Sequence, residues 1–159
     1  MISPGGLQPE LCNCLALRQA ARHVTQFYDG YLAAAGLRAT QFSILVRLRR
    51  LGPMTINALA EQMVMDRTTL GRNVLPLQRD GLIKIEATAS DRRAKELRLT
   101  KDGEKRLEAA RKGWHAAQAQ FETVFGVKRA AELRALLRGV VASELAPAAS
   151  AGSSLSSRK

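Results

Sequence analysis

The sequence predicts a mainly α-helical protein that contains one small β-hairpin. Over most of the 159 residues, apolar side chains recur at alternating steps of three and four, which is the spacing of an amphipathic helix. Two short segments, 82–87 and 96–100, instead alternate between apolar and polar residues, which is typical of paired strands. Hydrophobic residues make up 46% of the chain and aromatic residues only 4%, so the core of this fold must be aliphatic.

The N-terminal part predicts two helices. The first runs from about residue 8 to residue 35 and ends at Gly36, because glycine commonly terminates helices. The second, "TQFSILVRLRRL", begins with Thr40 as its N-cap and stops at Gly52 and Pro53. The apolar stripe of the first helix consists of Cys14, Leu17, Ala21, Val24, Tyr28 and Tyr31.

Two shorter helices follow in close succession. The segment "TINALAEQM" has Thr55 as its N-cap, and the segment "DRTTLGRNVLPLQRDG" has Asp66 as its N-cap and Gly81 as its terminator. Two short amphipathic helices joined by a tight turn form the outline of a helix-turn-helix. The apolar face of the second of these helices consists of Leu70, Val74 and Leu77.

The opposite face of that second helix suits the major groove of DNA. Thr68, Arg72 and Arg79 point away from the apolar positions. An arginine can donate two hydrogen bonds to guanine, and a threonine can contact a phosphate or a thymine methyl group. Gly71 removes bulk at the flank of this face, where a DNA backbone would approach, and Pro76 is expected to kink the helix behind it. An ordinary solvated helix face explains the same residues.

The hairpin carries positive charge at its tip. Its loop, "TASDRRAK", contains Arg92 and Arg93, which can enter a narrow minor groove where the negative potential is strong, and Asp91, which can brace one of them. The chain has 25 Lys and Arg against 14 Asp and Glu, a net charge of +11. Such an excess favours a polyanionic partner, either nucleic acid or an acidic membrane surface. A helix in the major groove beside a hairpin in the minor groove would form one continuous footprint, which favours DNA.

The C-terminal part predicts two further helices. Thr100 caps the first, Gly126 ends it, and the second covers about residues 128–145. The remaining residues are rich in Ala, Ser and Gly and are expected to be disordered.

The hairpin and the helix after it resemble a known family signature. The stretch "SDRRAKELRLTKDG" is similar to the wing of the MarR family of bacterial transcription regulators. The segments "GLRATQFSILVRL" and "MTINALAEQMVMDRTTLGRNVLPLQRDGLI" also resemble the family in order and spacing, and the resemblance covers roughly residues 11–145. The residues that match the wing signature are Asp91, Arg93, Leu97, Leu99 and Thr100.

The resemblance implies a winged helix-turn-helix homodimer that binds palindromic promoter DNA, as a repressor of its own or a neighbouring promoter. It assigns residues 8–38 to an N-terminal dimerisation helix, 39–100 to the DNA-binding domain, 101–146 to C-terminal dimerisation helices and 147–159 to the tail. Without it, the apolar stripes at the two ends would suit a monomeric bundle equally well. The DNA-binding residues that it implies are Thr55, Arg67, Thr68, Thr69, Arg72, Asn73, Asp91, Arg92, Arg93 and Lys95.

Two mechanisms of release from DNA fit the resemblance. The first is a small aromatic ligand held between the dimerisation helices and the winged helix, in a pocket formed by His23, Arg111 and Trp114 together with Tyr28. Each of these residues is also explained as a core or surface residue.

The second mechanism is oxidation of a thiol. Cys14 matches the cysteine of relatives that sense organic hydroperoxides, and Tyr28 matches a tyrosine that hydrogen-bonds the thiolate in those relatives. The other tyrosine positions of that pattern hold Arg18 and Ala39. A small core residue in the dimerisation stripe is the alternative role for Cys14. Cys12 is not expected to pair with Cys14, because residues two apart in one helix point to different sides.

Other classes of protein find little support in the sequence. No apolar run approaches the roughly 20 residues that cross a bilayer, and the start of the chain does not resemble a signal peptide, so a cytoplasmic protein that contacts no membrane is expected. The two histidines, His23 and His115, lie far apart and lack companions at metal-binding spacing. We therefore expect no cofactor, no metal and no enzymatic activity. A winged helix used for protein contact remains the alternative from a different class.

Overall fold

The computed structural model describes residues 8–88, 91 and 94–145 of the chain. The chain divides into two compact units, Met1–Gln120 and Phe121–Lys159. Within the described ranges, no helix combines the length and the apolar character that are needed to span a membrane.

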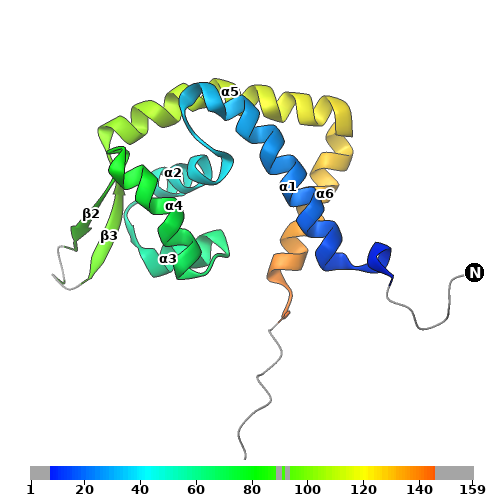
Figure 1. Cartoon of the computed structure of the whole chain (residues 1–159), viewed down its shortest axis with the longest axis horizontal. Helices are drawn as coiled ribbons and strands as arrows, with labels where there is room; N and C mark the ends of the chain where they lie inside the picture. The colour runs from blue at the N-terminus through cyan, green and yellow to red at the C-terminus, as the bar shows by residue number, and fades with distance from the viewer. Residues whose placement is uncertain (1–7, 89–90, 92–93, 146–159) are drawn as a thin grey trace, which may run out of the picture. The chain divides into compact units, whose positions relative to one another are not determined.

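The N-terminal helix is shorter than the sequence predicts. A 3₁₀ turn, η1 (Pro9–Leu11), precedes α1 (Asn13–Leu32), and a second one, η2 (Ala33–Ala35), follows it (Figure 1). Cys12 separates η1 from α1 because it has an extended backbone, and its Sγ accepts the Leu15 N–H at 3.4 Å as the N-cap. Gly36 has a φ of 68°, which confirms it as the terminator.

The second helix begins through a contact that the sequence does not reveal. Helix α2 (Ala39–Leu51) starts one residue before Thr40, so the assignment of Thr40 as its N-cap is wrong. Asp29 of α1 supplies the missing acceptor, because its Oδ1 accepts the Ala39 N–H at 2.7 Å. A side chain from the preceding helix therefore caps α2. Its buried residues are Ile44, Leu45 and Leu48.

The predicted helix-turn-helix is present as α3 (Ile56–Met63) and α4 (Arg67–Arg79). Both predicted caps are confirmed: Thr55 Oγ1 accepts the Ala58 N–H at 3.2 Å, and Asp66 caps α4. The helix runs through Pro76 to Arg79 as one element, and Gly81 follows with a φ of 70°. The predicted inward face is confirmed, because Leu70, Val74 and Leu77 are buried.

The turn between α3 and α4 contains an unusual backbone conformation. Val64 has a φ of 52° and is the described non-glycine residue with a positive φ. The N–H of Met65 donates to Ala60 O and the N–H of Val64 to Glu61 O, which is the hydrogen-bond pattern of a Schellman motif. This motif usually places glycine in the left-handed position, and a β-branched residue there is strained.

The hairpin consists of β2 (Ile83–Ala87) and β3 (Lys95–Leu99), which pair antiparallel with Ile83 opposite Leu99. A third strand, β1 (Met54–Thr55), pairs with β3 and gives the order β1-β3-β2. The sequence does not predict β1, because two residues are too short to show alternation. Ile83 and Leu97 are buried and attach the sheet to the helical core.

The part of helix α5 (Lys101–Phe125) that belongs to the first unit packs inside that unit through two glycines. A Cβ at Gly103 would lie 2.1 Å from the carbonyl oxygen of Leu82, and one at Gly113 would lie 2.3 Å from that of Tyr31. Both values are far inside van der Waals contact, so only glycine permits this approach of α5. Buried Leu107 lies between the two glycines in sequence.

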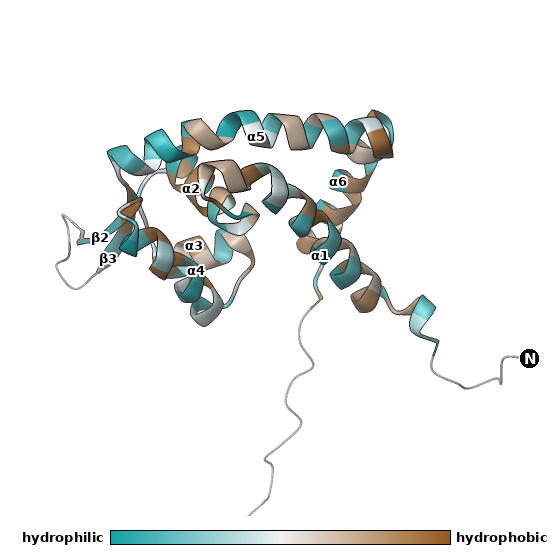
Figure 2. Ribbon diagram, turned by 45° about the horizontal axis from the view of Figure 1, so that its top comes forward, coloured by the Kyte–Doolittle hydropathy of each residue, from teal (hydrophilic) through white to brown (hydrophobic). Residues whose placement is uncertain are grey.

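The second unit contains the end of α5 and helix α6 (Val127–Ala142). Gly126, with a φ of 94°, separates the two helices, as the sequence predicts. Arg134 forms an ion pair with Glu122 at 3.3 Å. Figure 2 shows hydrophobic residues along α6, and several of them are exposed: Leu136, Leu137, Val140 and Val141.

Candidate nucleic-acid interface

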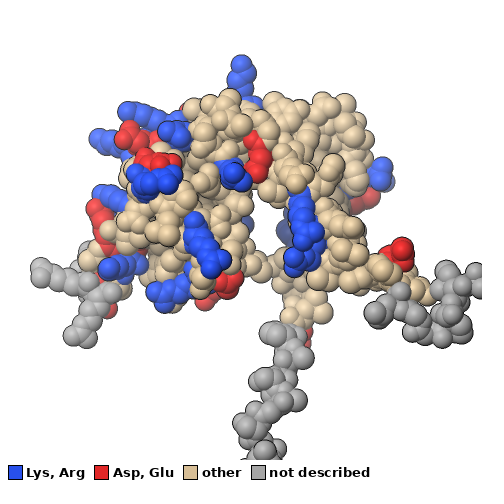
Figure 3. Space-filling view, in the orientation of Figure 1, with Lys and Arg blue, Asp and Glu red and all other residues tan. Residues whose placement is uncertain are grey.

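The face of α4 that opposes the core is polar and exposed. Leu70 and Val74 are buried, whereas Arg72, which lies between them in the sequence, is exposed. Figure 3 shows lysine and arginine side chains, with acidic ones among them, over the part of the first unit that holds α3, α4 and the hairpin. The exposed predicted residues of this face are Arg67, Thr68, Thr69 and Arg72, and Asn73 is half-buried beside them.

Asp66 and Thr69 are joined by two hydrogen bonds at the start of α4. Asp66 Oδ1 accepts the Thr69 backbone N–H at 2.8 Å, and Asp66 Oδ2 accepts the Thr69 hydroxyl at 2.6 Å. The hydroxyl bond, followed by the bond from the Thr69 N–H, holds the pKa of Asp66 below its ordinary value. The carboxylate is therefore ionised and fixed at neutral pH. The three-residue spacing indicates the backbone cap, but not the bond between the side chains.

The middle of α4 leaves space for an approaching molecule. A Cβ at Gly71 would meet no described atom within 4 Å, so the surface of α4 is open at this position. Asn73 Nδ2 donates to the Thr69 carbonyl oxygen at 2.9 Å, one turn earlier. Its side-chain oxygen and second N–H remain for the bidentate contact that asparagine makes with adenine.

The hairpin is described only in part. Lys95 is exposed at the start of β3, while Arg92 and Arg93 lie outside the described residues. Thr88 Oγ1 donates to the Asp91 carbonyl oxygen at 2.8 Å and accepts the Asp91 N–H at 2.9 Å, which fixes the backbone before the tip. The contacts of both arginines with DNA, and the bracing by the Asp91 carboxylate, stay predictions from the sequence.

The charged residues along the strands pair with one another. Glu86 accepts from Lys84 Nζ at 2.6 Å and from Arg98 Nε at 3.4 Å, and Arg98 also pairs with Glu96 at 3.6 Å. These contacts neutralise much of the positive charge on this face of the sheet. Thr55, predicted to contact DNA, lies half-buried at the start of α3, and its oxygen caps that helix.

A cavity of about 200 Å³ lies between α1, α2 and α5 in the first unit. Trp114, predicted as a pocket residue, lines it and stacks on Phe42 with ring centroids 6.3 Å apart. Tyr28 also lines it, and its hydroxyl donates to Gln118 Oε1 at 2.6 Å. The remaining lining residues are Val24, Thr25, Leu32, Ala39 and Ser43, so no charged side chain is among the lining residues.

Two predicted pocket residues do not line this cavity. His23 is exposed, because it precedes Val24 and so projects to a different side of α1. Arg111 is exposed on α5 and pairs with Glu108 at 3.0 Å. Neither residue belongs to this cavity, and their role in holding a ligand stays a prediction. Phe42 and Ser43 of α2 line the cavity instead; Phe42 is half-buried and Ser43 is exposed.

The two predicted redox residues do not meet within one chain. Cys14 and Tyr28 are fourteen residues apart on α1, which at about 1.5 Å per residue places them about 21 Å apart. Both cysteines are free and exposed. The argument that Cys12 and Cys14 lie in one helix is wrong, because α1 begins at Asn13.

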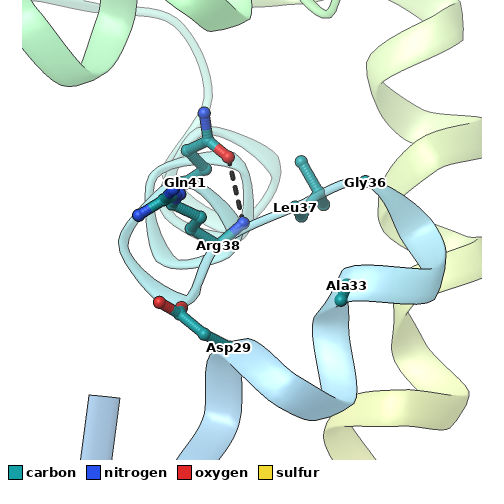
Figure 4. A pocket seen from close by; sticks show the side chains of 6 residues that line it. All are labelled: Asp29, Ala33, Gly36, Leu37, Arg38 and Gln41. Carbon is teal, nitrogen blue, oxygen red and sulfur yellow. Dashed lines mark hydrogen bonds between the residues drawn. The ribbon is translucent and has the colours of Figure 1, made fainter. Parts of the chain in front are cut away.

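A second cavity, of about 420 Å³, adjoins the connection between α1 and α2 (Figure 4). Arg38 N–H donates to Gln41 Oε1 at 3.0 Å at its edge, and the Asp29 carboxylate already caps α2 there. Leu37 and the small residues Ala33 and Gly36 complete the lining, and none of the predicted ligand residues belongs to it.

Comparison with known proteins places this arrangement in a family. A MarR family model matches residues 37–95. The HTH-type transcriptional regulator YwoH of Bacillus subtilis is 30% identical over 92 residues, and the match covers 58% of this chain and 66% of that relative's length.

Solved structures extend the similarity over most of the chain. The M. tuberculosis transcriptional regulator MosR matches with a TM-score of 0.72 at 31% identity, covering 86% of this chain and 100% of that one. The same regulator in complex with DNA matches with a TM-score of 0.68 at 34% identity, covering 83% and 99%. A probable transcriptional regulator from Pseudomonas aeruginosa has a TM-score of 0.75 at 28% identity, covering 84% and 99%.

The fold and these similarities lead to one assignment. Helices α3 and α4, followed by a three-stranded antiparallel sheet, form a winged helix-turn-helix. The matched relatives are transcriptional regulators, which confirms the expectation of a regulator rather than an enzyme. The chain belongs to the MarR family of winged helix-turn-helix transcriptional regulators.

Proposed function

We propose that this protein is a homodimeric repressor that acts in the cytoplasm and binds palindromic promoter DNA through α4 and the hairpin. The observation that carries the proposal is the exposed polar face of α4, with Arg72 directly opposite the buried Val74 side of the helix. The DNA-bound structure of MosR, at 34% identity, supports the same partner. In this arrangement Arg72 contacts a base edge in the major groove and Lys95 contacts a phosphate.

The proposed dimer rests on exposed apolar residues at both ends of the chain. Leu15 and Leu17 of α1 are exposed, as are Leu136 and Val141 of α6. Large exposed apolar surfaces mark interfaces between proteins, because solvating them is unfavourable. A palindromic site requires two copies related by a two-fold axis, which one chain cannot supply.

Binding to duplex DNA from upstream of its own gene tests the proposal. Wild type and Arg72→Ala are titrated against this duplex at several salt concentrations, with Arg111→Ala as a matched control, since Arg111 is an exposed arginine away from α4. Binding through several phosphates loses affinity by about 10³-fold or more between 50 and 200 mM salt. We expect Arg72→Ala to lose the preference for a particular base at one position of the site. Arg111→Ala should keep that preference.

Three outcomes would each contradict one part of this function. Uniform weakening across all sequences with Arg72→Ala would make Arg72 a phosphate contact instead of a base reader. Binding to a protein with little salt dependence, and none to duplex DNA, would favour the alternative of a protein-interaction module. A monomer in sedimentation at micromolar concentration would rule out the dimer.

The proposed effector is a small aromatic molecule in the cavity between α1, α2 and α5. A cavity of about 150 Å³ can hold a benzene ring, so a volume of about 200 Å³ accommodates one ring with a small substituent. The rings of Phe42 and Trp114 offer stacking surfaces, and the hydroxyls of Thr25 and Ser43 offer polar contacts. Because no charged side chain lines the cavity, we expect a neutral phenol to bind in preference to an aromatic carboxylate.

The cavity contains its own optical reporter, because Trp114 is the one tryptophan in the sequence. Titration with phenol is expected to change Trp114 fluorescence and to release DNA, and benzoate is expected to do neither. Ser43→Leu, which fills the cavity, should remove both effects, while His23→Leu, outside the cavity, should retain them. Equal responses to phenol in wild type and Ser43→Leu would exclude this cavity as the effector site.

Thiol oxidation is the second candidate for release. The observation in its favour is that Cys12 and Cys14 are both free and exposed, so a peroxide can reach them. Cumene hydroperoxide should then abolish DNA binding by wild type and leave Cys14→Ser unaffected. Identical binding with and without the peroxide would leave both cysteines without a sensing role.

A further inference from the structure

Two adjacent threonines in the first turn of α4 differ in their hydrogen bonds. The Thr69 hydroxyl donates to Asp66 Oδ2 at 2.6 Å. Thr68 is equally exposed, and within the described ranges its side chain makes no hydrogen bond. The two side chains are chemically identical, and the bond to Asp66 is what distinguishes the Thr69 hydroxyl from that of Thr68.

The bond to Asp66 decides the direction in which Thr69 can hydrogen-bond a ligand. A carboxylate that is ionised at neutral pH only accepts hydrogen bonds, so the proton between the two side chains belongs to Thr69. A hydroxyl group has one proton and two lone pairs. With its proton engaged by Asp66, the exposed Thr69 oxygen can accept a hydrogen bond from a ligand but cannot donate one.

The same carboxylate occupies one of the N–H groups that a helix N-terminus usually offers to a phosphate. Backbone N–H groups at the start of a helix commonly bind phosphate. Here Asp66 Oδ1 accepts the Thr69 N–H at 2.8 Å, and the negative charge of Asp66 repels a second anion. A phosphate oxygen is an acceptor, so it can pair neither with the Thr69 hydroxyl nor with this N–H group.

Only two groups on the major-groove edges of DNA can donate a hydrogen bond. These are the exocyclic amines of adenine, at N6, and of cytosine, at N4, whereas guanine and thymine present acceptors there. We propose that Thr69 is a specificity-determining residue that reads one such amine by accepting a hydrogen bond from it, because Asp66 holds the Thr69 proton. The inference rests on the proposed binding of α4 in the major groove.

Asn73 holds Thr69 in place from the other side. Its Nδ2 donates to the Thr69 carbonyl oxygen at 2.9 Å, while Asp66 holds the Thr69 side chain and N–H. A reader whose position is set before binding loses little freedom when it meets its base. The geometry therefore favours discrimination by Thr69 over adaptive contact with any base.

The test replaces single bases in a duplex that wild-type protein selects from random-sequence DNA. Replacing one adenine with purine, or one cytosine with 2-pyrimidinone, removes one exocyclic amine at a time. Comparison of the two kinds of replacement shows whether Thr69 contacts adenine or cytosine. Wild type, Thr69→Val, Thr69→Ser and Thr68→Val are compared at fixed salt. Far-UV circular dichroism and thermal unfolding confirm that each variant is folded.

We expect one position in each half-site where removal of the amine weakens wild-type binding by about 2- to 10-fold, the range of a single hydrogen bond. Thr69→Val should bind the duplexes with and without this amine equally, and Thr69→Ser should discriminate as wild type does. Thr68→Val should weaken binding to all duplexes alike and leave the discrimination intact.

Two results would overturn the inference. The first is the absence of any amine-sensitive position with wild type, which needs no variant. The second is discrimination that persists in Thr69→Val, which includes the case in which Thr69→Val weakens binding to all duplexes equally. Failure of wild type to bind any duplex would be a different result, because it would remove the proposed function together with the inference.

Discussion

The hydroxyl of Thr100 donates a hydrogen bond to the carbonyl oxygen of Gly81 at 2.6 Å. The same hydroxyl accepts the Gly103 N–H at 3.0 Å, as the cap of α5. One side chain therefore joins the residue that ends the helix-turn-helix to the first turn of α5. The Thr100 N–H also donates to Leu82 O at 3.1 Å, which closes the base of the hairpin.

Replacing Thr100 with valine should therefore destabilise the protein and weaken DNA binding together. Loss of the cap and of one hydrogen bond is expected to lower the free energy of unfolding by about 1–2 kcal/mol. Denaturant titration measures this loss, and Thr100→Ser, which keeps the hydroxyl, should lose little. Equal stability of Thr100→Val and wild type would mean that the hydroxyl bonds do not stabilise the junction.

Substitution of Gly71 separates stability from DNA binding. A Cβ at this position meets no described atom, and alanine is favoured over glycine inside a helix by about 0.5–1 kcal/mol, so Gly71→Ala should raise the melting temperature. If DNA approaches this flank closely, the added methyl group should weaken DNA binding. Gly30→Ala, which also has open space in α1, is the control and should stabilise without affecting DNA affinity. Unchanged DNA affinity of Gly71→Ala would show that the DNA does not come close.

Relief of backbone strain at Val64 should stabilise the protein. Left-handed backbone costs a residue other than glycine, asparagine or aspartate about 1–2 kcal/mol, and Val64 has a φ of 52° with a side chain that is 70% exposed. Val64→Asn is therefore expected to raise the free energy of unfolding by about 1 kcal/mol. Val64→Ala removes the same side chain but keeps most of the backbone cost, so it should gain less. Equal effects of the two substitutions would argue against strain as the cause.

The stability of the start of α4 should depend on pH through Asp66. The bonds from Thr69 hold the pKa of Asp66 below its ordinary value, so the carboxylate stabilises the folded state at neutral pH. This contribution is present above the pKa of the unfolded chain and is lost as pH falls through the lower pKa of the folded state.

Comparison with Asp66→Asn isolates that effect, because asparagine also caps helices but does not titrate in this range. The difference in unfolding free energy between the two proteins should shrink as pH falls through the acidic range. The chemical shift of the Thr69 amide, followed by NMR, should report the same titration. A titration of the amide at or above the pH expected for an unfolded chain would contradict the assignment.

The N-caps show which features of the fold follow from neighbouring residues alone. Thr55, Asp66 and Thr100 were all predicted to cap helices and do so, because each accepts an N–H group three residues later in the chain. The same rule predicts Thr40 as the N-cap of α2, and this prediction is wrong, because Asp29 accepts the first N–H of α2 instead. A cap supplied by another helix has no signature in the local sequence.

The candidate site also contains features that the local sequence predicts and one that required the structure. The sequence alone indicated the polar face of α4 and the charged hairpin, because helical phase and strand alternation are properties of a few consecutive residues. The Asp66 to Thr69 side-chain bond, by contrast, required the rotamers of both residues, which no spacing rule specifies.

By itself, the sequence determined the order of the long helices and the two hairpin strands, their terminating glycines and the exposed face of α4, since these follow from local periodicity and backbone preference. Only the tertiary structure decided that β1 joins the sheet, that Phe42 and Ser43 replace His23 and Arg111 at the cavity, and that α5 packs where Gly113 meets Tyr31. These features depend on contacts between segments far apart in the chain. Such contacts are set by how whole elements pack, and not by the residues on either side of each position.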